Sequence, residues 1–459
     1  MKKFLSLFLA FLMVASCFAT IPFSAFAAIT SSNSGWNGTS YKMPVGLGTK
    51  DDPYLIESAA NLLWIQKSIP QGDAVNNAHA DVLAGKYRAA FDGVYFKQTA
   101  DIDLNGKDFK SIGYYYSNSE RMAAFGGEYD GQGFKIYNGY IKTVNTSHNW
   151  AANYNWGHGL FGMIYGATIK NLTLDNVEVF GCGITGAIVG RAIAPSTNTD
   201  PEFNVIENCH VTANVTYTLG FPTNNDAPTA ADGTSHDGTD KTPGRLGGIV
   251  GMAYGTTVEN CSVAATISYY QAYSLVGGIV GTAGFNCVVN NCVFSGRLTM
   301  DNREYACDSQ ESANGGIVGF ISPFSSGSVD KSFSGSVKIL NCYNSGSFTY
   351  LGTGKPAKAT YWGGILGGIN TLHYVAPTVE DPYPFLIENC YNSYNLTSAG
   401  SLNGVTVDQF RIGGLLGSSY CAGNADCGTL WIKDSASVDV DERKYNGTNE
   451  YRQHSNVTK

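Results

Sequence analysis

An acidic stretch of the chain contains carboxylates of the kind that catalyse the cleavage of sugar linkages. Asp301, Glu304 and Asp308 are spaced three and four residues apart, with Arg303 beside them. A glycoside hydrolase needs two carboxylates roughly 5–10 Å apart, and a lyase of the pectate type needs clustered carboxylates for Ca²⁺ plus a base. We therefore take Asp301, Glu304 and Asp308 as the catalytic candidates. The simpler interpretation is that this acidic loop is only a solvated loop.

Aromatic residues offer a second kind of chemistry, which is ligand binding without catalysis. Trp150, Tyr154, Trp156, Tyr361 and Trp362 are expected to form a surface platform, because sugar rings present apolar faces that stack on Trp and Tyr. The alternative is that many of these rings pack between loops and the wall of the protein. We assign these five residues as the ligand-binding candidates.

The cysteines recur at one position of a repeat. Five of them directly follow an Asn: Cys209, Cys261, Cys292, Cys342 and Cys390. Equivalent residues of stacked repeats point the same way, so we predict a ladder of buried free thiols. No metal site is expected, because a ladder does not bring ligands together around one point. Short spacing leaves open a disulfide between Cys287 and Cys292, and another between Cys421 and Cys427.

Other sequence signals do not indicate chemistry. Asp101 and Asp103 share a strand face and could be paired carboxylates, but a structural role in the first repeat is the favoured interpretation. The chain has no HExxH, GxSxG or P-loop motif. We expect no cofactor.

Two short blocks recur along the chain and must position these residues. A glycine block is centred on doubled glycines at 247, 277, 315, 363 and 413, which are 30, 38, 48 and 50 residues apart. Between them lies an Asn-Cys block, as in Ile206-Glu207-Asn208-Cys209. Fixed short strands joined by loops of variable length are typical of a solenoid. The spacing leaves open whether each long step is one coil with insertions or two coils.

The composition agrees with a solenoid. Gly makes up 55 of 459 residues, about 12% against a usual ~7%, and charged residues are only 14%. Gly is expected at corners with positive φ, and the Asn before Cys at a left-handed corner or in a side-chain amide ladder. We predict an all-β chain folded as a single right-handed parallel β-helix with long side loops.

These blocks resemble the GLUG motif of bacterial surface proteins, a group that includes adhesins and the N-terminal regions of IgA-specific metallopeptidases. Upstream segments resemble the same group, among them Gly46-Leu47-Gly48-Thr49, Tyr129-Asp130-Gly131 and an amphipathic stretch from Ala59 to Ser68. The resemblance covers residues 46–440. It implies a helix over Ala59–Ser68 that caps the first coil, and a surface location. The peptidase half of that architecture is missing, since HExxH is absent.

The N-terminus has the features of an export signal. Lys2 and Lys3 precede an apolar run, and Ala25-Phe26-Ala27 is a cleavage-type site. Cys17 sits in a lipobox-like context, which is the less favoured alternative. We predict a signal peptide over 1–27, a flexible segment over 28–45, the β-helix over 46–440 and a tail over 441–459. No later run reaches the ~18 apolar residues of a membrane helix.

The favoured function is an extracellular adhesin or glycan-binding module, secreted or associated with the cell surface. Its partner would be a glycan or a surface protein of a host or neighbouring cell. The net charge of −8 argues against nucleic acid. The alternative is a secreted carbohydrate-active enzyme, either a polysaccharide lyase or a glycoside hydrolase, so whether the chain is an enzyme stays open, with binding favoured.

Overall fold

The computed structural model describes part of the chain. Its described residues are 35–69, 89–116, 121–142, 157–181, 184–194, 203–219, 244–270, 274–302, 312–322, 335–352, 360–370, 378–379, 381–393, 395–398, 410–420 and 430–437. The chain divides into Met1–Ser34 and Gly35–Lys459, and every described residue belongs to the second unit. The predicted signal peptide with Cys17, the tail 441–459 and the pair Cys421 and Cys427 lie outside the described residues.

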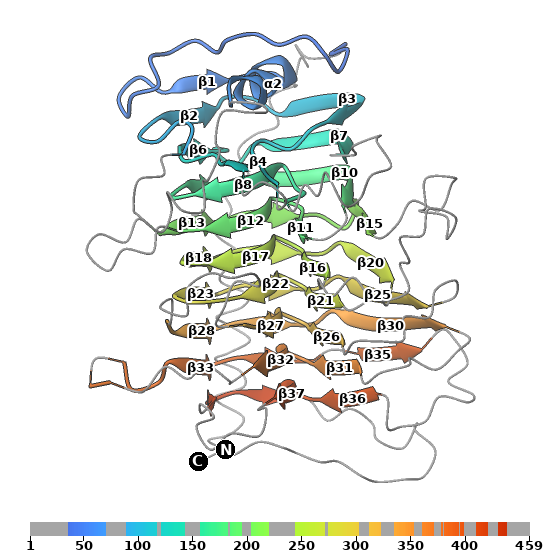
Figure 1. Ribbon diagram of the computed structural model, residues 1–459. Helices are drawn as coiled ribbons and strands as arrows, with labels where there is room; N and C mark the ends of the chain where they lie inside the picture. The colour runs from blue at the N-terminus through green and yellow to red at the C-terminus, as the bar shows by residue number, and fades with distance from the viewer. Residues whose placement is uncertain are drawn as a thin grey trace, which may run out of the picture. The chain divides into compact units, whose positions relative to one another are not determined.

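The strands of the second unit form a parallel β-helix built from four parallel sheets of ten, fourteen, six and seven strands. A single coil visits them in a fixed order, as Figure 1 shows for the strands in its middle. One coil runs through β17 (Val250–Tyr254), β18 (Thr256–Glu259), β19 (Ser262–Val263), β20 (Thr266–Tyr270) and β21 (Ser274–Gly277). Neighbouring strands within each sheet come from successive coils, so the fold predicted from the repeats is confirmed.

The other strands repeat this order in each sheet. The ten-stranded sheet also holds β1 (Tyr54–Ile56), β2 (Tyr95–Gln98), β6 (Glu128–Asp130), β9 (Thr168–Lys170), β13 (Asn204–Glu207), β23 (Cys287–Asn290), β28 (Val337–Leu340), β33 (Phe385–Glu388) and β38 (Trp431–Lys433). The fourteen-stranded sheet also holds β3 (Ile102–Phe109), β7 (Lys135–Lys142), β10 (Thr173–Gly181), β14 (His210–Val211), β15 (Thr216–Leu219), β24 (Val293–Phe294), β25 (Arg297–Asn302), β29 (Tyr343–Asn344), β30 (Ser347–Gly352), β34 (Tyr391–Asn392), β35 (Asn395–Ser398) and β39 (Ala436–Ser437).

The glycine blocks lie where the six- and seven-stranded sheets meet. The six-stranded sheet also holds β11 (Ile184–Gly186), β16 (Gly244–Gly247), β26 (Ser312–Gly315), β31 (Thr360–Gly363) and β36 (Phe410–Gly413). The seven-stranded sheet also holds β8 (Phe161–Tyr165), β12 (Val189–Ile193), β22 (Val280–Ala283), β27 (Val318–Ile321), β32 (Leu366–Asn370) and β37 (Leu416–Tyr420). A short antiparallel pair, β4 (Tyr114–Tyr116) and β5 (Arg121–Ala123), stands apart.

The register shows how many coils each glycine step contains. The first glycine of every block pairs directly with that of the next block, at Gly247, Gly277, Gly315, Gly363 and Gly413. Each step of 30 to 50 residues is therefore one coil that carries inserted loops, and the two-coil alternative is wrong.

Close approach of the chain to itself requires the doubled glycine. A Cβ on Gly277 would collide with the carbonyl oxygen of Val280, and one on Gly278 would collide with the Phe294 ring and the Gly316 carbonyl. Neither glycine is among the residues with positive φ. The expectation that these glycines supply left-handed corners is therefore wrong for this block, because the space around the Cβ position, and not φ, selects glycine there.

Asparagine supplies the left-handed corner between the ten- and fourteen-stranded sheets. The corner residues have φ between 45° and 55°: Asn171, Asn208, Asn260, Asn291, Asn341, Asn389 and Asp434. Their side chains also bond from coil to coil, since Asn291 Nδ2 donates to Asn260 Oδ1 at 2.8 Å and Asn208 Nδ2 donates to Asn171 Oδ1 at 2.8 Å. Both roles predicted for this Asn are present.

The predicted thiol ladder lies inside the coil. Its five cysteines are buried and free: Cys209, Cys261, Cys292, Cys342 and Cys390. Each thiol donates to the carbonyl two residues earlier, for example Cys261 Sγ to Glu259 O at 3.1 Å. Cys287 is a free, buried thiol as well, so the disulfide alternative with Cys292 is not formed.

The helix α2 covers the first coil over Ala59–Ser68, the bounds predicted from the sequence. Ser58 caps it by accepting from Asn61 N, and the helix packs Leu62 and Ile65 into the main core. Part of the segment expected to be flexible makes defined contacts here: Trp36 is buried, and its carbonyl accepts from Asn105 Nδ2 at 2.9 Å. Within the described part of the chain no helix is long and apolar enough to cross a membrane.

Candidate functional site

The predicted catalytic carboxylates are not brought together by the described part of the structure. Asp301 lies in β25, where its backbone pairs with Tyr270 and Leu351 of the neighbouring coils. Glu304 and Asp308 lie outside the described residues. Among the described residues, no group of three or more His, Cys, Asp or Glu side chains could hold a metal ion.

Two of the five residues predicted for the aromatic platform, Tyr361 and Trp362, are buried. Trp150, Tyr154 and Trp156 lie outside the described residues. Trp362 is 2% exposed and stacks on Phe348 with ring centroids 3.0 Å apart. The neighbouring Tyr361 is 7% exposed. Neither ring can offer a face to a ligand in this conformation, which corrects the expectation for these two residues.

The strand register explains why Trp362 is buried. Trp362 occupies the column of the residue that precedes each doubled glycine, and this column points into the coil. The buried members are Leu246, Val276, Asn314 and Trp362, and the backbone of Ile412 continues their register. The apolar residues of the other coils at this position already indicated an interior site.

The carboxylates of Asp101 and Asp103 accept hydrogen bonds from neighbouring residues. Asp101 Oδ1 accepts from Lys135 N at 3.0 Å, while Asp103 Oδ1 accepts from Asn105 N at 2.7 Å and Asn138 Nδ2 at 2.8 Å. These bonds hold the turn of the first coil against the second, in agreement with the structural interpretation of this pair.

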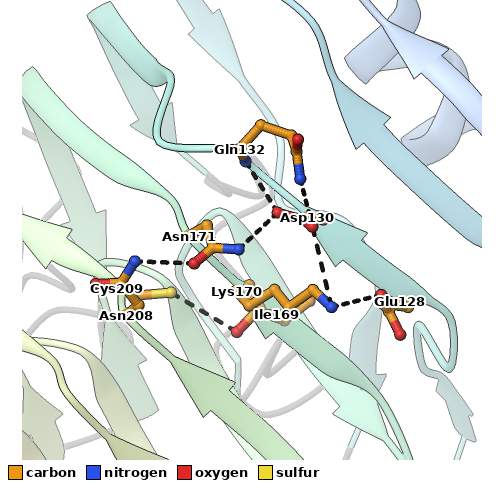
Figure 2. A network of polar contacts seen from close by, with 8 residues as sticks. All are labelled: Glu128, Asp130, Gln132, Ile169, Lys170, Asn171, Asn208 and Cys209. Carbon is orange, nitrogen blue, oxygen red and sulfur yellow. Dashed lines mark hydrogen bonds and ion pairs between the residues drawn. The ribbon is translucent and has the colours of Figure 1, made fainter. Parts of the chain in front are cut away.

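A network of polar contacts joins β6 and β9 (Figure 2). Lys170 Nζ lies 2.7 Å from Glu128 Oε1 and 3.9 Å from Asp130 Oδ2. The hydrogen bond with Glu128 is the main cause that raises the pKa of Lys170. Asp130 also accepts from Gln132 Nε2 at 2.6 Å and Asn171 Nδ2 at 2.8 Å. Both carboxylates therefore face donors already in place, and the network joins coils rather than forming an open acid–base pair.

Exposed tyrosines at the C-terminal coils form a better candidate. Tyr343 on β29 and Tyr391 on β34 pair in register and are 38% and 52% exposed. Each follows a ladder cysteine, Cys342 or Cys390, that points into the core. Because successive residues of a strand point to opposite faces, the buried cysteine directs the next side chain outward.

Amides and hydroxyls flank these rings. Asn341 and Asn389 are exposed corner residues, and Asn389 Nδ2 donates to Asn341 Oδ1 at 3.3 Å. The Tyr343 hydroxyl lies 2.7 Å from Ser393 Oγ. We call Asn341, Tyr343, Asn389, Tyr391 and Ser393 the corner strip.

A second aromatic group lies on the same coils, at the ten-stranded sheet. The Tyr383 and Trp431 rings meet edge to face with centroids 5.0 Å apart, and Lys433 Nζ lies 3.2 Å from the Tyr383 centroid. Lys338 Nζ on β28 forms an ion pair with Asp381 Oδ1 at 3.0 Å. On this face, Lys338 is thus paired with a carboxylate and Lys433 is held against an aromatic ring.

The corner strip has the two properties that a sugar-binding surface needs. An exposed ring offers an apolar face to the C–H face of a pyranose. An amide offers both a donor and an acceptor to its hydroxyls. Sequence reasoning missed these tyrosines although a signal was present: Cys342-Tyr343-Asn344-Ser345 recurs as Cys390-Tyr391-Asn392-Ser393.

One repeat of the chain matches a known sequence motif. Residues 242–268 match the GLUG motif, a stretch that includes the doubled glycine Gly247-Gly248 and the corner Asn260-Cys261. No curated protein matches the chain. A solved structure described as a "putative immunoglobulin A1 protease" from Bacteroides ovatus is 19% identical with a TM-score of 0.47, and the match covers 85% of this chain and 86% of that one.

Proposed function

We propose that this chain is a secreted or cell-surface β-helix protein that binds glycans through the corner strip, in the manner of an adhesin. The observation that carries the proposal is the pair of exposed, in-register tyrosines, Tyr343 and Tyr391, beside the exposed corner amides of Asn341 and Asn389. Rigid parallel strands hold these groups in place, so binding does not require a loop to become ordered first.

Export is supported by the sequence of the N-terminus. A basic start at Lys2 and Lys3, an apolar run and the Ala25-Phe26-Ala27 site form the pattern of a signal peptide over 1–27. In the resulting mature protein, residues 46–440 would be the β-helix and 441–459 a tail. The GLUG match supports placing it among bacterial surface proteins.

The test is a glycan-array screen of residues 28–459, followed by calorimetry on the sugars that bind. The double variant Tyr343→Ala/Tyr391→Ala is compared with Tyr140→Ala, which removes a ring of similar exposure, 39%, on β7. Each aromatic contact contributes on the order of 1 kcal/mol, so the double variant should bind roughly 30-fold more weakly. Tyr140→Ala should bind as the parent does.

The same experiment separates the alternatives. Equal binding by the parent and the double variant would refute the corner strip as the site. Bound oligosaccharides recovered shorter than they were supplied would replace the proposal with a carbohydrate-active enzyme, and would return attention to Asp301, Glu304 and Asp308. An array without any bound glycan would leave a protein partner as the explanation for the strip.

A further inference from the structure

We infer that the ligand of the corner strip is a neutral, extended polysaccharide whose chain runs across the coils, with one sugar ring per coil. The inference rests on the proposed function and adds the direction and the class of the ligand. It starts from the column of residues that follow the ladder cysteines, which are His210, Ser262, Val293, Tyr343 and Tyr391, and which Ala436 continues in the next coil.

The spacing of this column is set by the parallel sheet. Adjacent strands lie about 4.8 Å apart, and Tyr343 and Tyr391 are direct register partners on β29 and β34. This distance is close to the advance per ring of an extended β-linked polysaccharide. Two neighbouring rings of such a chain can therefore meet one tyrosine each.

The polar groups repeat with the same period as the rings. Asn341 and Asn389 precede the tyrosines by two residues at corners of nearly identical backbone, φ 53° and 52°. Asn341 Nδ2 donates to Asn290 Oδ1 at 2.9 Å, and Asn389 Nδ2 donates to Asn341 Oδ1 at 3.3 Å. An amide has two N–H donors and two acceptor sites, so each retains capacity for a sugar hydroxyl after these bonds.

A ligand running along a strand would meet a different surface. Beyond Tyr391 the chain continues to Asn392, which is 2% exposed and turned inward, where its Nδ2 donates to Ser437 Oγ at 3.0 Å. Along β34 there is thus a single exposed ring, whereas across the coils there are two. The repeated unit of ring and amide favours the direction across the coils.

The charge of the strip favours a neutral ligand. Its five members carry no charge, and the nearest column on the ten-stranded sheet holds Leu340, Glu388 and Lys433 in register. Lys433 lies over the Tyr383 ring, and Lys338 is bonded to Asp381. An anionic polysaccharide would need a row of free basic groups, and the described residues around the strip do not form one.

The row of exposed tyrosines ends at Tyr343, and the position one coil earlier allows a test. Val293, one coil before Tyr343, follows Cys292 and the corner residue Asn291, whose φ of 51° matches the other corners. A tyrosine at 293 should therefore point as Tyr343 and Tyr391 do. The variant Val293→Tyr would lengthen the platform by one ring, and Val293→Ala is its matched control.

The experiment measures the affinity of residues 28–459 for cello-oligosaccharides and chito-oligosaccharides of increasing length, with polygalacturonate as an anionic probe. We expect Val293→Tyr to shift the length at which affinity stops rising by one sugar, and to tighten binding of longer chains by several-fold, on the order of the value of one aromatic contact. Binding of the shortest chains should stay unchanged, as should all binding by Val293→Ala.

The outcomes distinguish this inference from the function on which it rests. An unchanged length dependence in Val293→Tyr, with binding still lost in Tyr343→Ala/Tyr391→Ala, would refute the direction but keep the site. Tighter binding of polygalacturonate than of the neutral chains would refute the neutral class. Undiminished binding by the double tyrosine variant, or no binding of any chain, would overturn the site and this inference together.

Discussion

Replacement of a corner asparagine tests how the coils are closed. Asn260 has φ 55° and an exposed side chain, and its Oδ1 accepts from Asn291 Nδ2 at 2.8 Å. In Asn260→Ala the left-handed backbone costs roughly 1–2 kcal/mol, and the lost hydrogen bond about 0.5–1.5 kcal/mol. The free energy of unfolding should therefore fall by about 1.5–3.5 kcal/mol.

The matched variant is Asn260→Gly, which loses the same hydrogen bond but accepts positive φ without strain. Its added cost is unfolded-state entropy of about 0.5–1 kcal/mol, so the glycine variant should remain the more stable of the two. Urea unfolding followed by far-UV circular dichroism measures both, provided that the m-values agree. A glycine variant as unstable as the alanine variant would show that left-handed strain is not what selects asparagine here.

Two further predictions concern titratable groups that are buried or half-buried. Burial lowers the pKa of His210, so below pH ~6.5, the pKa of an unfolded His, the unfolded chain binds a proton that the folded chain does not. The free energy of unfolding should therefore decline as the pH falls below ~6.5. A urea midpoint of the parent that falls with pH no more steeply than that of His210→Gln would contradict this. Burial also raises the pKa of Cys287 to about 12 and raises that of Cys261. Iodoacetamide should therefore label the buried thiols only after denaturation. If peptide mass spectrometry finds these thiols labelled in the native protein, they are not protected by the fold. The thiols concerned are Cys209, Cys261, Cys287, Cys292, Cys342 and Cys390.

Local patterns predicted much of the fold because they act within a few residues. The doubled glycines, the Asn-Cys corners and the stretch Ala59–Ser68 each behave as the sequence indicated for element type and position. The inward direction of the ladder cysteines follows from their recurrence at one repeat position. The predicted reason for the doubled glycine, a positive φ, was wrong. At Gly278 the Phe294 ring leaves no space for a Cβ, and φ is not positive.

The candidate site was predicted less well, because exposure depends on which wall of the coil a side chain joins. Trp362 looked like a surface ring until its register with Val276 and Ile412 placed it in an interior column. Tyr343 and Tyr391 lie 48 residues apart in the sequence, yet they are direct neighbours across β29 and β34.

The sequence by itself determined the type of structure and the direction of the side chains around each corner, since alternation along a strand and the backbone preference of asparagine are local effects. Only the tertiary structure decided that each glycine step is one coil and which residues of successive coils meet. Loops of different length separate the repeats, and strand spacing, not sequence distance, brings Tyr343 and Tyr391 together.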